Sequence, residues 1–136
     1  MEIDYRKELN KSQYEAVTTT EGPVLILAGA GTGKTRCMVY RVAYLIEKGV
    51  SPNNILLLTF TNKAANEMKQ RAADMLDERC SQITACTYHS FCAKMLRKYS
   101  QLIGIQSDYT IIDPGDCADI ISIIETEHGM DKVKDF

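Results

Sequence analysis

Short runs of apolar residues alternate along this chain with longer stretches in which apolar residues recur every three or four positions. The runs at residues 24–27, 55–60 and 83–87 are typical of buried strands. The periodic stretches predict helices over residues 10–18, 34–48, 63–76 and 90–102. Strands that alternate with helices indicate a parallel sheet, so we expect an α/β fold in three layers, with the three strands parallel and helices on both faces.

Turn and cap residues support these boundaries. Asn10 is expected to open the first helix, and either Thr61 or Asn62 caps the third. Gly49 and Gly104 are plausible ends of the second and fourth helices. From about residue 109 the chain becomes acidic and rich in isoleucine, which predicts a short extended stretch followed by a helix over residues 114–128.

Composition is that of an ordinary globular domain, with 136 residues, 45% of them hydrophobic and 25% charged. The longest apolar run, residues 24–30, is far too short to span a membrane, and the charged first ten residues do not form a signal peptide. Five cysteines without a CxxC pair suit reduced thiols. We therefore expect a cytoplasmic protein.

Net charge is −2, which gives no indication of a nucleic-acid partner, but its distribution is uneven. Residues 59–99 carry seven Lys/Arg and four Asp/Glu, whereas residues 100–136 carry two Lys and eight Asp/Glu. The mildly basic middle could hold phosphates. On charge alone, ordinary helix surface charge explains the distribution better.

A glycine-rich sequence lies between the first predicted strand and the second predicted helix. It reads Ala28-Gly29-Ala30-Gly31-Thr32-Gly33-Lys34-Thr35. Glycines let the backbone turn tightly and bring its N–H groups to phosphates, Lys34 suits the β- and γ-phosphates, and the Thr35 hydroxyl suits Mg²⁺. Ala28 stands where the strict phosphate-loop pattern has Gly. The alternative is a strand–helix turn with an incidental lysine, which the flanking elements make much less favourable.

Further motifs follow this loop in order. Residues 9–13 resemble the Q motif of UvrD/Rep/PcrA-type superfamily-one helicases, residues 28–35 their first motif, residues 59–68 motif Ia and residues 87–91 motif Ib, with Tyr88 where Phe is usual. These helicases commonly carry Ala at the first loop position. Residues 109–113 resemble the start of their inserted helical subdomain. The resemblance covers the full chain.

This resemblance implies ATP and Mg²⁺ as cofactors, held by Gln13, Arg36 and the loop from Ala28 to Thr35, with Lys34 and Thr35 taking part in catalysis and Thr35 holding the metal. Gln13 would read the adenine edge, although it also fits a capping box with Asn10. Arg36 would pack on the adenine, and its alternative is a solvated helix arginine.

The resemblance also implies contacts to single-stranded DNA. Phe60 would stack on a base, and the alternative is a core residue at the end of a strand. Phosphates would be contacted by Thr61, Asn62, Thr87, His89 and Ser90. For Asn62 and Ser90 the alternative is helix capping, and for His89 it is a strand-end histidine bonded to backbone. The sequence Cys86, His89, Cys92 has no second ligand pair, so we do not expect zinc there.

By this resemblance, residues 1–108 belong to a RecA-like ATP-binding domain and residues 109–136 begin the inserted subdomain. The family's Asp-Glu motif is expected beyond residue 136, so residues 1–136 should bind nucleotide weakly without hydrolysing it. The parent protein would be a DNA-repair helicase that unwinds duplex–single-strand junctions. Missing strands would leave an uncovered sheet edge, which favours self-association. The competing interpretations are a separate binding module for nucleotide or single-stranded DNA, and a small P-loop kinase, for which the later motifs have no role.

Overall fold

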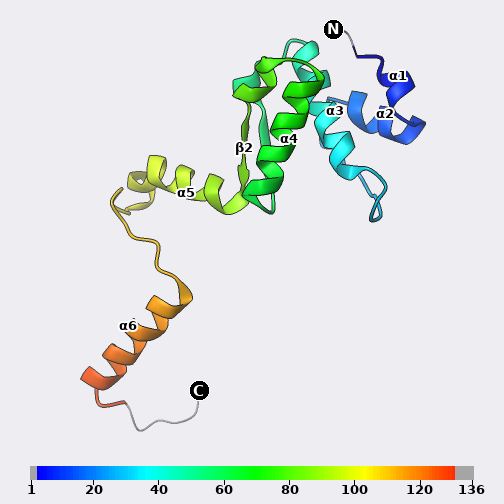
Figure 1. Cartoon of the computed structure of the whole chain (residues 1–136). Helices are drawn as coiled ribbons and strands as arrows, with labels where there is room; N and C mark the ends of the chain where they lie inside the picture. The colour runs from blue at the N-terminus through cyan, green and yellow to red at the C-terminus, as the bar shows by residue number, and fades with distance from the viewer. Residues whose placement is uncertain (1–2, 131–136) are drawn as a thin grey trace. The chain divides into compact units, whose positions relative to one another are not determined.

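The computed structural model describes residues 3–130, and the chain divides into two compact units, Met1–Lys94 and Met95–Phe136 (Figure 1). The boundary falls inside helix α5 (Tyr88–Tyr99). Each unit is described by itself. The domain boundary predicted after residue 108 stays a prediction.

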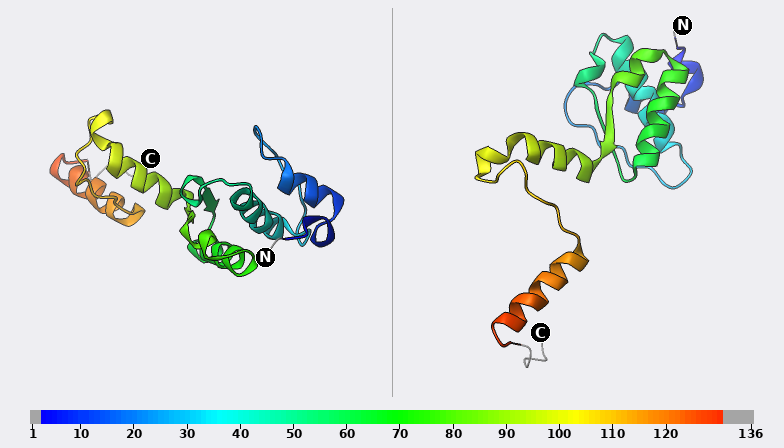
Figure 2. Two further views of the ribbon diagram at one scale, coloured as in Figure 1. Left: turned by 90° about the horizontal axis from the view of Figure 1, so that it is seen from above. Right: turned by 60° about the vertical axis from the view of Figure 1, so that its left-hand side comes forward.

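The first unit contains a parallel sheet made of β1 (Leu56–Thr59) and β2 (Thr84–Thr87). The two strands pair residue for residue, from Leu56 opposite Thr84 to Thr59 opposite Thr87. Helix α4 (Asn62–Met75) connects them and contacts both strands (Figures 1 and 2). Two of the three predicted strands are therefore confirmed, together with their parallel direction and the α/β class.

The third predicted strand is wrong: residues 24–27 form no strand. Leu25 and Leu27 are 83% and 87% exposed, and Val24 is exposed as well. An extended segment becomes a strand only when a neighbour pairs with its N–H and C=O groups. In the described part of the chain, neither β1 nor β2 pairs with these residues. The apolar composition of residues 24–27 suits a strand, but neither strand of the sheet pairs with them.

The main core lies between α3 (Lys34–Glu47), α4 and the sheet. Val39, Val42 and Ile46 form one stripe of α3, and the core cluster continues through Ile55, Leu57, Ala72, Cys80 and Ile83. The spacing of three and four residues places the α3 side chains on one helix face. The predicted helices over residues 34–48 and 63–76 are confirmed, and Gly49 follows the first of them with φ 89°.

A smaller cluster fixes the N-terminal helices to α3. It combines Tyr5 of α1 (Tyr5–Glu8), Leu9, Val17 of α2 (Lys11–Thr18) and Tyr40 of α3. Tyr5 meets the rings of Tyr40 and Tyr44 edge to face, with centroids 6.1 and 5.2 Å apart. Helix α2 agrees with the prediction, whereas α1 is too short to show a periodic pattern and was not predicted. These contacts bring residues 5–18 beside the start of α3.

The remaining elements are short turns and the helices of the C-terminal part. The segments η1 (Pro52–Asn54), η2 (Glu78–Gln82) and η3 (Ser100–Ile103) are 3₁₀ turns. Helix α5 starts two residues earlier than predicted and passes into η3 before Gly104 (φ 74°). The predicted C-terminal helix is confirmed as α6 (Pro114–Glu127), capped by Asp113. Over residues 3–130, no helix has the length and apolar character that a membrane span requires.

Candidate nucleotide loop and nucleic-acid interface

The glycine-rich loop is shaped by two left-handed glycines. Gly31 has φ 74° and Gly33 has φ 90°, values that side chains with a Cβ rarely adopt. Gly33 is also the N-cap of α3, and no described side chain caps that helix. The first N–H groups of a 14-residue helix therefore face the loop, which is the arrangement that binds anions.

Lys34 places its positive charge against the loop. Its Nζ donates to the carbonyl oxygens of Ala28 and Gly29 at 3.0 and 2.7 Å. The Thr32 hydroxyl donates to the same Gly29 carbonyl at 2.8 Å, which closes the loop on itself. The Thr35 side chain is exposed in the first turn of α3. The ammonium, the loop N–H groups and the Thr35 hydroxyl are thus gathered at one helix start.

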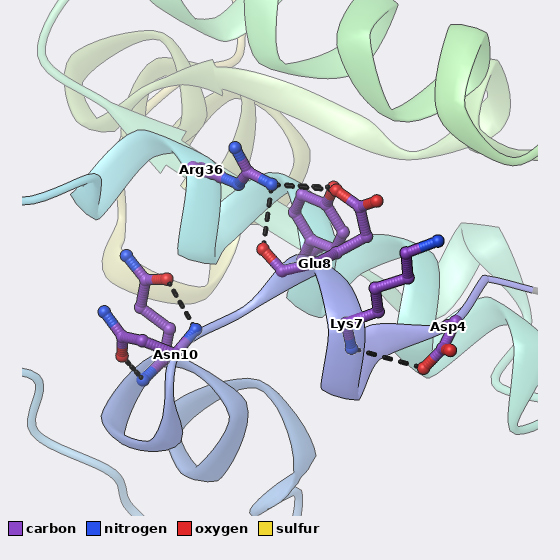
Figure 3. A network of polar contacts seen from close by, with 7 residues as sticks. Asp4, Lys7, Glu8, Asn10 and Arg36 are labelled. Atoms are coloured by element: carbon purple, nitrogen blue, oxygen red, sulfur yellow. Dashed lines mark hydrogen bonds and ion pairs between the residues drawn. The ribbon is translucent and has the colours of Figure 1, made fainter.

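Gln13 connects the N-terminal helices to this loop. Its Oε1 accepts from the Asn10 backbone N–H at 3.2 Å, and Asn10 Oδ1 accepts from the Gln13 N–H at 2.9 Å (Figure 3). This reciprocal pair confirms the capping box. The Gln13 Nε2 also donates to the Thr32 carbonyl at 3.1 Å. A Cβ at Gly33 would lie 3.0 Å from that nitrogen, a tight contact, and the positive φ of Gly33 independently favours glycine there.

A cavity of about 230 Å³ lies where these segments meet. It is open to solvent along the exposed loop and reaches down to the buried Cys37 of α3. Burial raises the pKa of the Cys37 thiol, and the neighbouring Arg36 partly opposes that shift. The lining side chains and loop residues include Asn10, Gln13, Ala28, Gly29, Thr32 and Lys34. Gln13 therefore shares one cavity with part of the phosphate loop. The predicted residues that do not line it are Ala30, Gly31, Gly33, Thr35 and Arg36.

Arg36 is held by Glu8, which the sequence analysis did not identify. Its Nη2 donates to the Glu8 backbone carbonyl at 2.8 Å and forms an ion pair with Glu8 Oε2 at 2.9 Å (Figure 3). The guanidinium also lies 5.2 Å from the centre of the Tyr40 ring. Burial raises the pKa of Tyr40, and its hydrogen bond to Glu8 at 3.1 Å raises it further. Arg36 is therefore an anchor between α3 and α1, and no local sequence signal links positions 28 residues apart.

Exposed aromatic and polar residues follow the carboxyl ends of both strands. Phe60 comes directly after β1 and is 96% exposed, so the alternative that it is a core residue is wrong. Tyr88 comes directly after β2 and is 65% exposed. His89 is also exposed and lies within α5, not at a strand end. Since Thr59 and Thr87 are register partners, these residues start from neighbouring points on one sheet edge.

Two threonines cap the helices that start at this edge. The Thr61 hydroxyl accepts from the Ala64 N–H at 3.1 Å, so Thr61, not Asn62, is the cap of α4. The Thr87 hydroxyl accepts from the Ser90 N–H at 3.1 Å and donates to the Ser90 hydroxyl at 2.9 Å. The capping alternatives for Asn62 and Ser90 are thus wrong, because the preceding threonines perform that task. Asn62 is the exposed first residue of α4.

Three thiols of the first unit are buried, those of Cys37, Cys80 and Cys86. Cys86 is buried in β2, whereas His89 is exposed and Cys92 is half-buried in α5. Within residues 3–130, no group of three His, Cys, Asp or Glu side chains is arranged to hold a metal ion. The five cysteines are unpaired thiols.

A protein-family model matches nearly the whole of this chain. The model of the UvrD/REP helicase N-terminal domain matches residues 9–135, which include the Gln13 box, the phosphate loop and the edge beyond both strands. The chain belongs to the UvrD/REP helicase N-terminal domain family.

Curated relatives support the same assignment. The ATP-dependent DNA helicase PcrA of Staphylococcus epidermidis is 50% identical over 126 residues, which cover 92% of this chain and 17% of that protein. PcrA of Staphylococcus aureus is 48% identical over 127 residues, covering 93% and 17%. This UvrD/REP chain thus corresponds to about one sixth of the length of those helicases. The roles of individual residues stay predictions.

Proposed function

We propose that this UvrD/REP domain binds ATP with Mg²⁺ on residues 28–35 and single-stranded DNA on the edge beyond β1 and β2. In this proposal it is the first part of a RecA-like domain in a cytoplasmic DNA helicase that couples ATP hydrolysis to translocation, unwinding and repair. The observation that carries the proposal is the loop itself: two left-handed glycines and the Lys34 ammonium at the uncapped start of α3.

Phosphate binding would exchange one set of partners of Lys34 for another. Its ammonium now donates to the carbonyls of Ala28 and Gly29, whose partial charges are weaker than those of phosphate oxygens. Charge-assisted hydrogen bonds to phosphate are about twice as strong as neutral ones. The loop N–H groups and the first turn of α3 would contribute the remaining donors.

Mg²⁺ fits the hydroxyl of Thr35, because this side chain is exposed beside Lys34 in the first turn of α3. A hydroxyl oxygen is a ligand that this hard cation accepts, together with waters and phosphate oxygens. When bound, the metal neutralises charge that develops on the phosphates during transfer. Thr35 would hold and orient it.

Adenine recognition would use Gln13 and Arg36, and both side chains already have hydrogen-bond partners in the protein. The Gln13 amide is engaged with Asn10 and Thr32 on both of its ends. Arg36 is engaged with Glu8 and Tyr40. Base contacts would have to use the donors and acceptors that these bonds leave over, so we expect weak binding of ATP or ADP.

Hydrolysis needs a carboxylate that orients the attacking water. The acidic residues Asp113 and Asp116 are the reciprocal cap of α6, with Asp113 Oδ1 accepting the Asp116 N–H at 3.0 Å. A carboxylate occupied in this way has a structural role. We therefore expect no ATP turnover by residues 1–136.

The nucleotide part of the proposal is tested by equilibrium binding of fluorescent ATP and ADP analogues to residues 1–136, with Mg²⁺ and with EDTA. Lys34→Ala should weaken binding about tenfold or more, since charged hydrogen bonds contribute about 1.5–3 kcal/mol. The matched control is Lys48→Ala, at the opposite end of the same helix. Equal affinity of the two variants contradicts phosphate binding on the loop.

A separate binding module remains the second candidate, because the two recognition sites do not by themselves require catalysis. Steady-state ATPase measurements with and without single-stranded DNA, using Lys34→Ala as the contamination control, separate the two in the longer protein that contains this domain. DNA-stimulated turnover that Lys34→Ala removes identifies the translocating enzyme. The same turnover in residues 1–136 alone would show that a catalytic carboxylate is present among them.

A further inference from the structure

We propose that Tyr88 is a second base-stacking residue, which works beside Phe60 to hold two bases of one single strand. This inference rests on the proposed DNA-binding function and adds a contact residue to it. Both aromatic residues belong to the unit that ends at Lys94. The argument uses their position in the sheet, their exposure and the polar groups around them.

The two rings start from equivalent positions on adjacent strands. Thr59 and Thr87 face each other as the last pair of the parallel ladder. Phe60 directly follows β1 and Tyr88 directly follows β2, and neighbouring strands lie about 4.8 Å apart. The carboxyl edge of a parallel sheet is where ligands of such folds bind. A strand of DNA that reaches one ring is therefore within reach of the other.

Exposure distinguishes these two rings from the other aromatic residues of the first unit. Tyr5 and Tyr40 are buried in the small core, and Tyr14, Tyr44 and Phe91 are partly covered. Phe60 and Tyr88 are 96% and 65% exposed. A folded chain gains nothing from leaving two adjacent large rings in water, because burial of an aromatic side chain is among the largest apolar gains. Two such rings that start from adjacent strand ends favour an apolar, flat ligand.

The polar surroundings of the rings select single-stranded nucleic acid among flat ligands. Both rings stand at helix starts, where α4 and α5 present backbone N–H groups. Lys63 in the first turn of α4 is exposed. Stacking aromatics combined with a cationic side chain for the backbone phosphates is the pattern of proteins that bind single strands without reading sequence.

The chain contains no tryptophan, which permits a direct test. Three variants each carry one tryptophan: Phe60→Trp, Tyr88→Trp and, as the control, Tyr99→Trp at the far end of α5, where the side chain is 47% exposed. Each is titrated with an oligothymidylate while tryptophan emission is recorded. Circular dichroism verifies that all three keep the helical content of the unaltered chain.

We expect quenching of the tryptophan at positions 60 and 88 with one shared dissociation constant, and none at position 99. Quenching at position 60 without quenching at position 88 overturns the role of Tyr88 and leaves DNA binding intact. No response at either position overturns DNA binding on this edge and the present inference with it. Equal quenching at position 99 shows that the signal is not local, which also overturns the inference.

Salt dependence supplies a second, independent readout. Tyr88→Ala should weaken binding by roughly fivefold or more at every salt concentration, and Tyr88→Phe should restore it. The slope of log affinity against log salt should stay unchanged, because stacking releases no counterions. Lys63→Ala should instead reduce that slope by about one. A changed slope for Tyr88→Ala, or failure of Tyr88→Phe to restore affinity, overturns stacking by Tyr88.

Discussion

Replacing Phe60 with alanine tests whether this side chain serves binding or folding. The ring is 96% exposed, so its removal takes almost no apolar surface out of a buried environment. We expect the free energy of unfolding to change by less than about 0.5 kcal/mol, as for other surface substitutions. The affinity for single-stranded DNA should fall by about 1–3 kcal/mol, the contribution of one base–aromatic stack.

Leu57, three residues earlier on β1, provides the matched control. Its side chain is 4% exposed and packs in the main core with Val39 and Ile46. Leu57→Ala should lower the free energy of unfolding by about 2–5 kcal/mol through the lost contacts and the cavity left behind. Phe60→Ala, just beyond β1, should therefore lose only binding, and Leu57→Ala, within β1, should lose mainly stability.

Two measurements on residues 1–136 separate these effects. Urea unfolding followed by circular dichroism gives the free energy of unfolding for both variants. Fluorescence anisotropy of a labelled single strand gives the affinity under conditions where each variant is folded. If Phe60→Ala unfolds as readily as Leu57→Ala while DNA affinity is retained, our reasoning from exposure to binding is refuted.

Three further predictions concern stability and association. Asn10→Ala should remove the cap of α2 and lower the free energy of unfolding by about 1 kcal/mol, whereas Asn66→Ala on the exposed face of α4 should not, as urea unfolding can show. Burial raises the pKa values of Cys37, Cys80, Tyr5 and Tyr40 in the folded state. Their contribution to the free energy of unfolding is therefore complete below the unfolded pKa values, about 8.5 for Cys and 10 for Tyr. It is lost as the pH rises from these unfolded values through the higher folded ones. Urea midpoints that do not fall between pH 8 and pH 11 would contradict this sign. Leu25 is exposed, and β1 pairs with β2 along one of its two sides. Both features should cause concentration-dependent self-association, which sedimentation velocity measures, and Leu25→Lys should reduce it.

Much of the candidate site could be predicted because its parts are local. Asn10 and Gln13 of the capping box are three positions apart, and the left-handed Gly31 and Gly33 lie within one turn. Contacts of this range depend on neighbours in sequence, so residue type and spacing are sufficient. The same holds for the helix boundary at Gly49.

Interactions between distant residues were not accessible in this way. Glu8 binds Arg36 from 28 positions away, and the short α1 that carries it has no periodic signal. Such contacts depend on where the chain returns to itself, and any acidic residue in the chain could have met Arg36.

The sequence by itself determined the local chemistry of this UvrD/REP domain: the phosphate loop, the order of its motifs, the α/β alternation and most helix ends. Only the tertiary structure decided which apolar segments pair and which apolar side chains stay in water. Residues 24–27 and Leu56–Thr59 have similar composition, yet only the second segment has a paired neighbour. Phe60 extends the same apolar run as Leu57, yet Phe60 is exposed and Leu57 is buried. The physical reason is that burial and strand pairing each need two segments that meet in space. The pattern of residues along one segment does not say which other segment it meets.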